Sequence, residues 1–461
     1  MSQLFSRYLP FMRLSSLLGH VQELLTLIFD AHRRRTNHAR VPPADAIIDS
    51  FFRARKYLGS QDRRFIAETT YGTLRHLKRC EYVVLMSISR PSIPQGDRAL
   101  LLPIAYLLHI ERRPPQDFMG LNSQIRAKDL RQDLPELLRR LSVFTLPVAN
   151  GPIERLALEY SFPEWIVHRL LHEFESAEVE RLLESLNEPA PLQLRVNTLK
   201  ATAEECKTRL ASEGIAAVRT QYSPIGLQLP KRINVFTHAS FREGFFEVQD
   251  EGSQLLPLLI DPKPTDKILD ACAGAGGKTL EFAALMRNRG EILATDVRAF
   301  RLQELKKRAK RAGVSNVRIQ WVDDLHELRE KYQAYFDVVF VDAPCSGLGT
   351  LRRNPGMKWS VSERSIDELA EKQKSILEAA WPLVKPGGRL VYATCTFLTE
   401  ENESVVAAFL KDHAPFQLVD CSALMSRLNL ETVHGGPFVK LFPHVHGTDG
   451  FFCAIMRRGK A

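Results

Sequence analysis

Five apolar, β-branched runs alternate with helical stretches in the second half of the chain, and this alternation constrains the fold more than any other feature. The runs are DKILDAC, GEILATD, VRIQWVD, FDVVFVDAP and GGRLVYATC. Strands that are apolar on both faces are what a parallel sheet covered by helices requires. Residues 239–461 are therefore predicted to form a doubly wound, Rossmann-like α/β domain.

The first part of the chain, residues 1–145, has a helical pattern throughout. Val21, Leu24, Leu25 and Ile28 recur at helical spacing, and prolines divide the segment into short helices. The longest apolar run, residues 99–108, is too short to cross a bilayer and indicates a buried helix. We expect an all-helical domain here and no membrane span.

Residues 146–238 change in character and are predicted to form a helical connector followed by a small α/β subdomain. PLQLRVNT and IGLQLP are typical of strands. Between them, ATAEECKTRLASEGI predicts a helix with Thr202 as N-cap and Gly214 at its end. The connector is expected at residues 164–186.

Composition limits the class of protein without fixing its activity. The 461 residues favour two or three domains, and 63 Lys and Arg against 54 Asp and Glu permit a nucleic-acid partner without establishing one. The cysteines are odd in number and form no CxxC pair, which argues against a zinc site or a disulfide framework. Together with the lack of a secretory signal pattern, this predicts a cytoplasmic protein without a metal.

A glycine-rich turn, DACAGAGGKT, follows the first strand of the predicted α/β domain. Glycines let the backbone turn sharply and approach a ligand, and the next helix presents its amino end. The closing GKT suggests a phosphate-binding loop, but that motif needs glycine where this chain has Cys272. We expect a cofactor-binding turn, with a tight structural turn as the alternative; its residues are Cys272, Ala273, Gly274, Ala275, Gly276, Gly277 and Lys278.

Acidic residues end the next two predicted strands. Asp296 lies about twenty residues beyond Gly276, where an acid can accept the ribose hydroxyls of an adenosine-bearing cofactor. The third strand ends at Asp323 and Asp324, placed to reach adenine, although either could instead cap a helix before Leu325. The pattern favours a nucleoside cofactor, but by itself it does not separate NAD from S-adenosylmethionine.

Two cysteines, Cys345 and Cys395, end the fourth and fifth predicted strands. Free cysteines are usually small buried hydrophobes, as we expect for Cys272 and Cys453, but the strand-end positions favour a chemical role for this pair. A thiolate is suited to add at C6 of cytosine and activate C5 towards a methyl donor. Asp342 would stabilise charge pushed onto the ring, or would form a salt bridge within its loop.

DACAGAGGKT, DAPCSGLGT and YATCT, in that order, resemble the RsmB and Sun branch of the RNA cytosine-5 methyltransferases. The likeness extends through residues 352–359, LAEKQKSIL, WPLVKPGGRL and residues 400–403, and it covers residues 190–457. FEVQDEGSQL and HGTDGFF bracket the domain in the family's order. QDRRFIAETTYGTLRHLKRC resembles, more loosely, the NusB-type helical RNA-binding domain of the RsmB members. Thr396 stands where the family usually has serine.

The resemblance implies roles for individual residues. Cys395 would attack C6 of the target cytosine and Cys345 would assist release of the product, while Lys278 and Asp342 would line the catalytic pocket. Asp296 would bind the ribose of S-adenosylmethionine and Asp323 would lie near its adenine. The substrate implied is RNA and not DNA, above all small-subunit (16S) ribosomal RNA. The target cytosine is expected to be single-stranded or flipped out. Nothing in the sequence demands more than a monomer, and we expect one.

Several alternatives stay open. The same chemistry could act on tRNA, or the chain could be a non-catalytic RNA-binding assembly factor. An NAD-dependent oxidoreductase would leave the paired cysteines unexplained, and a DNA cytosine methyltransferase would place its nucleophile at the Pro-Cys position, Cys345. RNA phosphates would meet basic clusters near the site; the candidates are residues 32–35 with Arg40, residues 306–308 with 310–311, and Arg352 with Arg353.

Overall fold

The computed structural model describes residues 13–33, 44–88, 93–430 and 436–460. Its contacts divide the chain into two compact units. The helical unit comprises residues 1–187 together with 353–362, and the α/β unit comprises residues 188–352 and 363–461. The division therefore falls at 187/188, so the expected connector packs with the helical unit. The three segments proposed from the sequence, with boundaries at 145 and 238, stay a prediction.

The described part of the helical unit contains helices and no strand, as the sequence predicts. Val21, Leu24, Leu25 and Ile28 are all fully buried in one apolar core. No helix of the described chain is long and apolar enough to cross a membrane. The α-helices are α1 (Leu14–Arg33), α2 (Ala44–Ala54), α3 (Ser60–Arg75), α4 (Leu77–Ser87), α5 (Gln95–Ala105), α6 (Lys128–Gln132), α7 (Leu134–Val143), α8 (Pro152–Glu159), α9 (Glu164–Glu173), α10 (Ser176–Leu186) and α17 (Met357–Ser360). A π-helical turn (Tyr106–Ile110) and a 3-10 helix (Pro115–Gln124) complete it.

The short helix α17 belongs to the helical unit although the chain on either side of it belongs to the α/β unit. Lys358 is fully buried, and its Nζ donates to the Arg75 carbonyl at 2.6 Å and lies 3.9 Å from the centre of the Phe162 ring. The Trp359 indole donates to the Leu74 carbonyl at 2.6 Å. Burial, helped by Arg75, lowers the pKa of Lys358. Residues 353–362 are thus part of this unit's packed interior.

The α/β unit begins with a small antiparallel sheet. Its strands are β1 (Leu192–Val196), β2 (Val218–Arg219), β3 (Gly226–Leu229) and β4 (Phe246–Val248), in the order β2-β3-β1-β4. The helix α11 (Ala203–Ser212) starts with a capping box in which Thr202 and Glu205 satisfy each other's backbone N–H groups, which confirms the predicted N-cap. A 3-10 turn (Val235–Thr237) and α12 (Ala239–Arg242) precede β4. The sequence predicts β1 and β3 but not β2 or β4.

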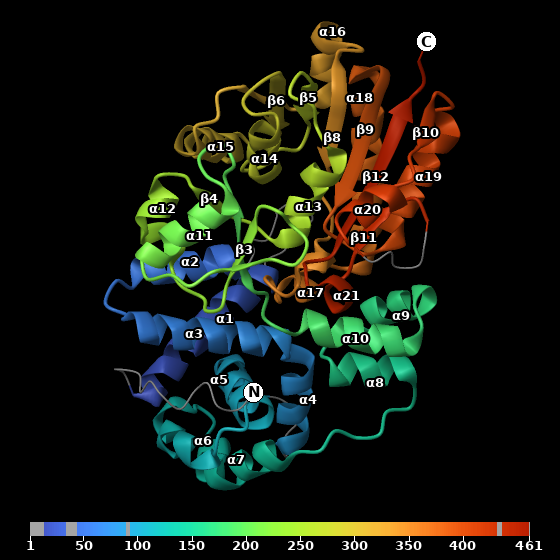
Figure 1. Cartoon of the computed structure of the whole chain (residues 1–461). Helices are drawn as coiled ribbons and strands as arrows, with labels where there is room; N and C mark the ends of the chain where they lie inside the picture. Colours follow the sequence, from blue (N-terminus) through green and yellow to red (C-terminus); the bar gives the residue numbers. More distant parts are fainter. Residues whose placement is uncertain (1–12, 34–43, 89–92, 431–435, 461) are drawn as a thin grey trace. The chain divides into compact units, whose positions relative to one another are not determined.

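The larger sheet has eight strands, five of them parallel as predicted. They are β5 (Lys267–Asp270), β6 (Glu291–Asp296), β7 (Val317–Trp321), β8 (Phe336–Asp342) and β9 (Val384–Thr394). Antiparallel strands β12 (Phe451–Arg458), β10 (Phe416–Leu418) and β11 (Val439–Leu441) extend the β9 side and are not predicted from the sequence. Seven strands follow the order β10-β12-β9-β8-β5-β6-β7, and the eighth, β11, pairs with β12 off this path. β5, β8, β9 and β12 lie side by side in Figure 1.

Helices cover both faces of this sheet, which confirms the doubly wound fold. Alternate residues of a strand point to opposite faces. Ile268 and Val338 pack into a core with α13 (Glu251–Ile260) and α14 (Gly277–Leu285), whereas Leu269 and Val339 pack with α18 (Glu363–Ala380) and α19 (Glu403–Asp412). The helices of the unit are α13 (Glu251–Ile260), α14 (Gly277–Leu285), α15 (Ala299–Ala312), α16 (Arg329–Tyr332), α18 (Glu363–Ala380), α19 (Glu403–Asp412), α20 (Ser422–Arg427) and α21 (Pro443–His446), with 3-10 turns at Leu325–Leu328, Leu348–Thr350, Trp381–Leu383 and Thr399–Glu401.

Candidate active site

The glycine-rich turn links β5 to α14 and leaves one side of its backbone open. Gly274 has φ +55° and Gly276 has φ +85°, conformations that favour glycine. A Cβ on Gly274 or Gly277 would meet no other described heavy atom within 4 Å, whereas one on Gly276 would stand 2.6 Å from the Leu305 side chain. The turn is therefore closed towards α15 and open at Gly274 and Gly277, as a backbone cradle for a cofactor requires.

Asp296, at the end of β6, lies directly beside this turn. Its buried carboxylate accepts from the Gly274 N–H at 2.9 Å and from the Arg298 backbone N–H at 2.8 Å. Asp323 is exposed after β7, and Asp324 caps the 3-10 turn at Leu325 by accepting from His326 N–H at 2.8 Å. The capping alternative is thus confirmed for Asp324, while Asp296 adjoins the cradle where a ribose-binding acid is expected.

Cys345 and Cys395 meet beyond the carboxyl ends of β8 and β9. Their sulfur atoms are 3.4 Å apart, and the Cys395 N–H points to the Cys345 sulfur at 3.4 Å. The hydrogen bond between the thiols, followed by burial, raises the pKa of Cys345 well above its usual value. Either thiol can donate the hydrogen bond between the two sulfur atoms.

Lys278 and Asp342 form an ion pair at the same edge of the sheet. The Lys278 Nζ lies 2.7 Å from an Asp342 carboxylate oxygen, which is the salt-bridge alternative considered for Asp342. Burial opposes the charge of Lys278, but Asp342, Cys395 and Asp270 together outweigh it, so the pKa of the lysine is raised. A positive charge is thus held close to the two thiols.

A buried polar cluster beneath the thiols fixes the two cysteine loops to each other. The fully buried Glu401 carboxylate accepts from the Ser346 N–H at 2.8 Å, from the Ser346 hydroxyl and from the Gln373 amide at 3.0 Å. The Gln373 amide also donates to the Pro344 carbonyl at 3.0 Å. The hydroxyl oxygens of Ser346 and Thr396 are 2.9 Å apart, so Thr396 uses its hydroxyl here. The sequence gives Gln373 and Glu401 only as parts of family motifs, with no role.

Two glycines allow a third backbone segment to approach the Cys395 loop. The Gly349 N–H donates to the Cys395 carbonyl at 2.9 Å, and the Gly450 N–H donates to the Gly349 carbonyl at 2.8 Å. A Cβ on Gly349 would stand 2.2 Å from the Gly450 carbonyl oxygen, which is backbone and cannot move aside cheaply. This contact explains why DAPCSGLGT and HGTDGFF both need glycine at these positions.

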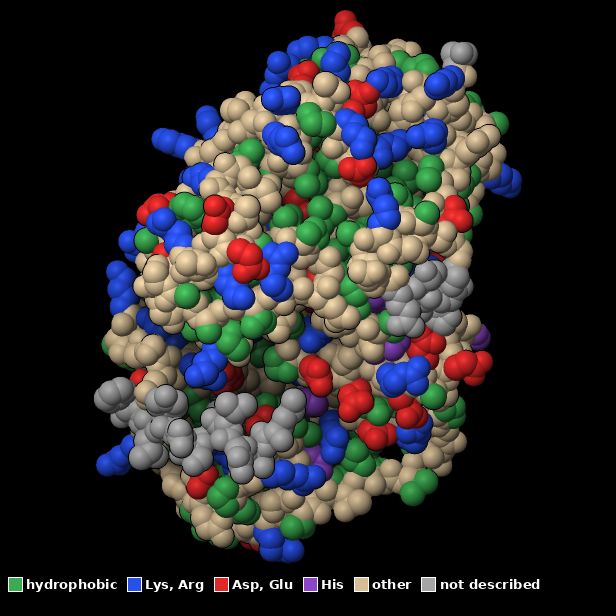
Figure 2. Space-filling view, in the orientation of Figure 1, with side chains coloured by type: hydrophobic (Ala, Val, Ile, Leu, Met, Phe, Trp, Pro, Cys, Tyr) green, Lys and Arg blue, Asp and Glu red, His purple; other side chains and the backbone are tan. Residues whose placement is uncertain are grey.

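Several basic residues considered for RNA contact form ion pairs or hydrogen bonds inside the α/β unit. Arg308 and Arg311 both pair with the buried Glu247, whereas Lys306, Lys307 and Lys310 are exposed. Arg352 is buried and donates to the Gly447 carbonyl at 2.7 Å. Arg34, Arg35 and Arg40 lie outside the described residues. Figure 2 shows Lys and Arg side chains scattered over the visible face of the α/β unit, with acidic side chains among them.

Asp270, at the end of β5, should make stability depend on pH. Burial raises the pKa of Asp270 to about 7, against 3.8 in a solvated chain, and the hydrogen bond from Thr279 only partly offsets this. Its stabilising contribution is therefore complete below the unfolded pKa and is lost as the pH rises through the folded pKa. Relative to the wild type, Asp270→Asn should gain on the order of 1–3 kcal/mol of unfolding free energy between about pH 5 and about pH 8. Urea denaturation at both pH values measures this, and a constant difference would contradict it.

The fold and the site together define an S-adenosylmethionine-dependent methyltransferase. The chain belongs to the RsmB/F family: residues 257–457 match the family model "16S rRNA methyltransferase RsmB/F", and residues 162–236 match the ferredoxin-like domain of the same proteins. A probable ribosomal RNA small subunit methyltransferase B of Bacillus subtilis is 33% identical over 87% of this chain and 92% of its own length. Its counterpart in Pectobacterium carotovorum is 31% identical over 86% and 91%.

Solved structures agree with this assignment. The crystal structure of PH0851 covers 98% of this chain and 100% of its own, with a TM-score of 0.78 and 27% identity. A methyltransferase homologue from Pyrococcus horikoshii covers 68% of this chain and 100% of its own, with a TM-score of 0.58 and 30% identity. The fold of this chain is therefore shared with solved structures that it matches over two thirds or more of its length.

Proposed function

We propose that this protein methylates C5 of a cytosine in small-subunit ribosomal RNA through a covalent bond between Cys395 and C6 of the base. The observation that carries the proposal is the 3.4 Å approach of the Cys345 and Cys395 sulfur atoms at the ends of neighbouring strands. A methyltransferase that acts on oxygen or on an exocyclic nitrogen needs no thiol, because those atoms are already nucleophilic. C5 of cytosine is not, and covalent addition at C6 makes it so.

The assignment of Cys395 as nucleophile rests on the resemblance of YATCT to the RsmB and Sun motif whose cysteine attacks C6, and on the groups that surround its sulfur. Cys345 holds its proton, because its pKa is raised, and can donate a hydrogen bond to the sulfur of Cys395. A hydrogen bond to the charged form favours a thiolate, and the Lys278 ammonium adds a favourable charge. Both the Cys345 thiol and the Lys278 ammonium lie beside the sulfur of Cys395, the cysteine of the TC motif.

In the addition, the Cys395 thiolate forms a bond to C6 and the electron pair of the C5–C6 double bond moves into the ring. The Lys278 ammonium, oriented by Asp342 at 2.7 Å, stabilises this negative charge. When bound, S-adenosylmethionine supplies an electrophilic methyl group. The cradle formed by Gly274, Gly277 and Asp296 would hold it, because its open backbone and buried acid fit a nucleoside cofactor.

Release requires that C5 lose its proton. The proton that Cys345 holds in the resting protein goes to solvent, and the resulting thiolate takes the proton from C5. The freed pair restores the C5–C6 double bond, and the C6–S bond breaks with its electrons returning to Cys395. The hydrogen bond with the Cys395 thiol is the first cause of the raised Cys345 pKa, and it is lost when the Cys395 sulfur is bonded to C6, so Cys345 can then give up its proton.

The RNA substrate is inferred from the relatives. Those from Bacillus subtilis and Pectobacterium carotovorum carry names that specify the small ribosomal subunit. The target base must leave its stack to reach a thiol at the end of a strand, so a single-stranded or flipped-out cytosine fits the site. Transfer RNA is the alternative substrate.

Trapping the covalent adduct tests the proposal. In Cys345→Ala, addition and methylation proceed but release does not, so cells that express this variant should accumulate protein crosslinked to RNA. Denaturing gels that retain the adduct, followed by sequencing of the attached RNA, measure both the bond and the substrate.

The matched control is Cys345→Ala/Cys395→Ala, which should give no adduct. An adduct that persists in the double variant, or that forms in Cys395→Ala alone, would overturn the assignment of the nucleophile and favour Cys345. Transfer RNA in the trapped fraction would overturn the ribosomal substrate and leave the chemistry intact.

A further inference from the structure

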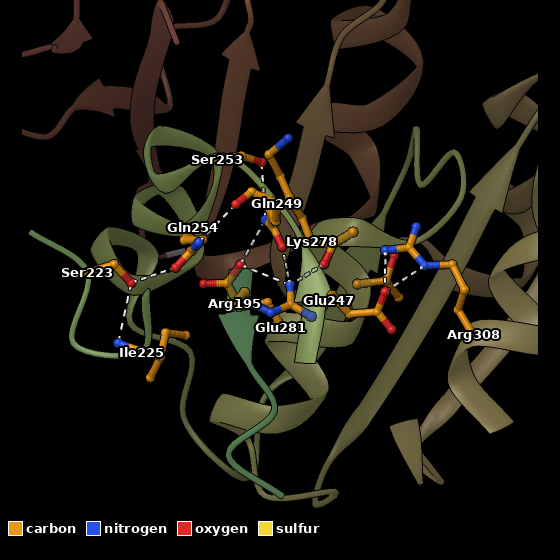
Figure 3. Close-up of polar contacts among 12 residues, drawn as sticks. Arg195, Ser223, Ile225, Glu247, Gln249, Ser253, Gln254, Lys278, Glu281 and Arg308 are labelled. Carbon is orange, nitrogen blue, oxygen red and sulfur yellow. Dashed lines mark hydrogen bonds and ion pairs between the residues drawn. The ribbon is translucent and has the colours of Figure 1, made fainter. Parts of the chain in front are cut away.

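A buried ion pair joins the small sheet to the cofactor-binding turn. Arg195 lies in β1 and Glu281 in α14, the helix that begins at the turn. The Arg195 Nη1 is 3.2 Å from a Glu281 carboxylate oxygen, and the two side chains are 3% and 0% exposed. Figure 3 shows the pair with Gln249 and Lys278 beside it. The ion pair is therefore shielded from solvent, and it connects the small sheet to a helix that packs on the large sheet.

The same Arg195 nitrogen also reaches the backbone of the turn. It donates to the Gly277 carbonyl and to the Gln249 side chain, whose amide in turn donates to Glu281 at 3.1 Å. The carbonyl and the following N–H of a trans peptide point in opposite directions. By holding the Gly277 carbonyl, Arg195 therefore fixes the direction of the Lys278 N–H in the first turn of α14, where such groups have no partner within the helix.

A second arginine holds the other side of the turn. Glu247 in β4 is the cross-strand neighbour of Arg195, and its buried carboxylate pairs with Arg308 at 3.0 Å and with Arg311. Arg308 then donates to the Ala275 carbonyl at 2.8 Å. Figure 3 shows the Glu247–Arg308 pair on one side of Arg195. The carbonyls that are held, Ala275 and Gly277, flank Gly276.

We propose that the small sheet positions the cofactor: Arg195 and Glu247, side by side on β1 and β4, clamp the glycine-rich turn from both sides through Gly277 and, by way of Arg308, through Ala275. Arg195 and Arg308 are positioning residues, since they act on the turn's backbone and not on the reacting atoms. This role depends on the cofactor site alone and is independent of which cysteine or RNA takes part in the reaction.

The energetics of the pair favour positioning over simple stabilisation. Burial lowers the pKa of Arg195 and raises that of Glu281 to about 7, so both groups resist being charged here. A buried ion pair commonly contributes less to stability than well-packed apolar residues of the same volume. What it supplies at this place is a defined orientation of the Gly277 carbonyl.

Calorimetric titration of the full chain with S-adenosylhomocysteine tests the clamp without requiring methyl transfer. In Arg195→Lys the charge beside Glu281 is kept but the fixed fork of the guanidinium is lost. We expect its dissociation constant to rise about tenfold, the equivalent of about one charged hydrogen bond. Arg308→Lys should have a similar effect. In both variants, kcat at saturating S-adenosylmethionine should change far less than the KM for S-adenosylmethionine.

The matched control is Arg209→Lys, which changes an arginine of the same subdomain that pairs with Glu243 and does not reach the turn. It should leave the dissociation constant unchanged. If Arg195→Lys does not fold, the dissociation constant of Arg308→Lys tests the clamp instead. Arg308 is only partly buried, so its replacement should be tolerated by the fold. Unchanged affinity in the folded variants, or an equal loss in Arg209→Lys, would overturn the clamp, whereas failure of adduct trapping would not affect it.

Discussion

Replacing Cys395 with alanine is expected to lower kcat by about 10⁴-fold or more, because the variant lacks the atom that adds to C6 and no other group can activate C5. The dissociation constant for S-adenosylhomocysteine should stay as in the wild type, since Cys395 does not contribute to the glycine-rich turn. Transfer of a labelled methyl group to a small-subunit RNA fragment measures the loss, and calorimetry measures the binding.

Cys206→Ala is a suitable control for this result. Cys206 is also a free cysteine, buried in α11 at a distance in sequence from the thiol pair, so its loss should leave kcat essentially unchanged. Methylation that survives in Cys395→Ala, together with abolished methylation in Cys345→Ala and no trapped adduct there, would show that the nucleophile is Cys345.

Replacing Glu401 with alanine is expected to lower the free energy of unfolding by about 2–4 kcal/mol, because three buried donors lose their acceptor at once. These are the Ser346 N–H, the Ser346 hydroxyl and the Gln373 amide. Since they fix the loops that carry Cys345 and Cys395, kcat should fall as well. Urea denaturation and methyl transfer measure the two effects.

Two variants serve as comparison for Glu401→Ala. Glu403→Ala removes a neighbouring carboxylate that pairs with Lys440 and is partly exposed, and it should cost less than about 1 kcal/mol. Glu401→Gln keeps an acceptor oxygen and should lie between the wild type and the alanine variant. If Glu401→Ala and Glu403→Ala lost equal stability, the buried carboxylate would not organise the cysteine loops.

The parallel core of the fold is predictable from the sequence because each of its strands can be recognised from its own few residues. β5, β6, β8 and the last part of β9 are apolar on both faces, and this is visible in DKILDAC or FDVVFVDAP without knowledge of the rest of the chain. The edge strand β7 alternates between apolar and polar residues. The capping of α11 is likewise local, because Thr202 contacts Glu205, three residues further along the chain. Such short-range patterns also place the glycine turn and both thiols at the ends of strands.

What the sequence does not predict depends on pairing between distant segments. The antiparallel strands β10, β11 and β12 are short or lie beside aromatic residues without clear alternation. β12 pairs with β9 and β10 across long stretches of chain and with β11 across a shorter one. The strands β2 and β4 have two and three residues, too few for a recognisable period. Tertiary contacts decide these elements, and local propensity does not.

The supporting residues of the site are missed for a similar reason. Glu401 stands in an acidic run, EENE, that is typical of a solvated surface, yet it is fully buried against a loop 55 residues away. Conversely, Arg308, Arg311 and Arg352 have the appearance of a nucleic-acid surface but pair with Glu247 or with the Gly447 carbonyl. The sign of a charge is visible in the sequence, but its burial is not.

The path of residues 353–362 determines whether the helical unit can be produced separately from the α/β unit. The chain enters the helical unit at residue 353 and returns to the α/β unit at Glu363, where α18 begins. Between these points, Lys358 is buried in the interior of the helical unit. No single cut separates the two halves with their interiors complete, because a fragment that ends at Asn187 would lack the lysine that binds the Arg75 carbonyl. The helical half is thus no detachable module, and gene fusions or truncations that treat it as one should yield poorly folded products.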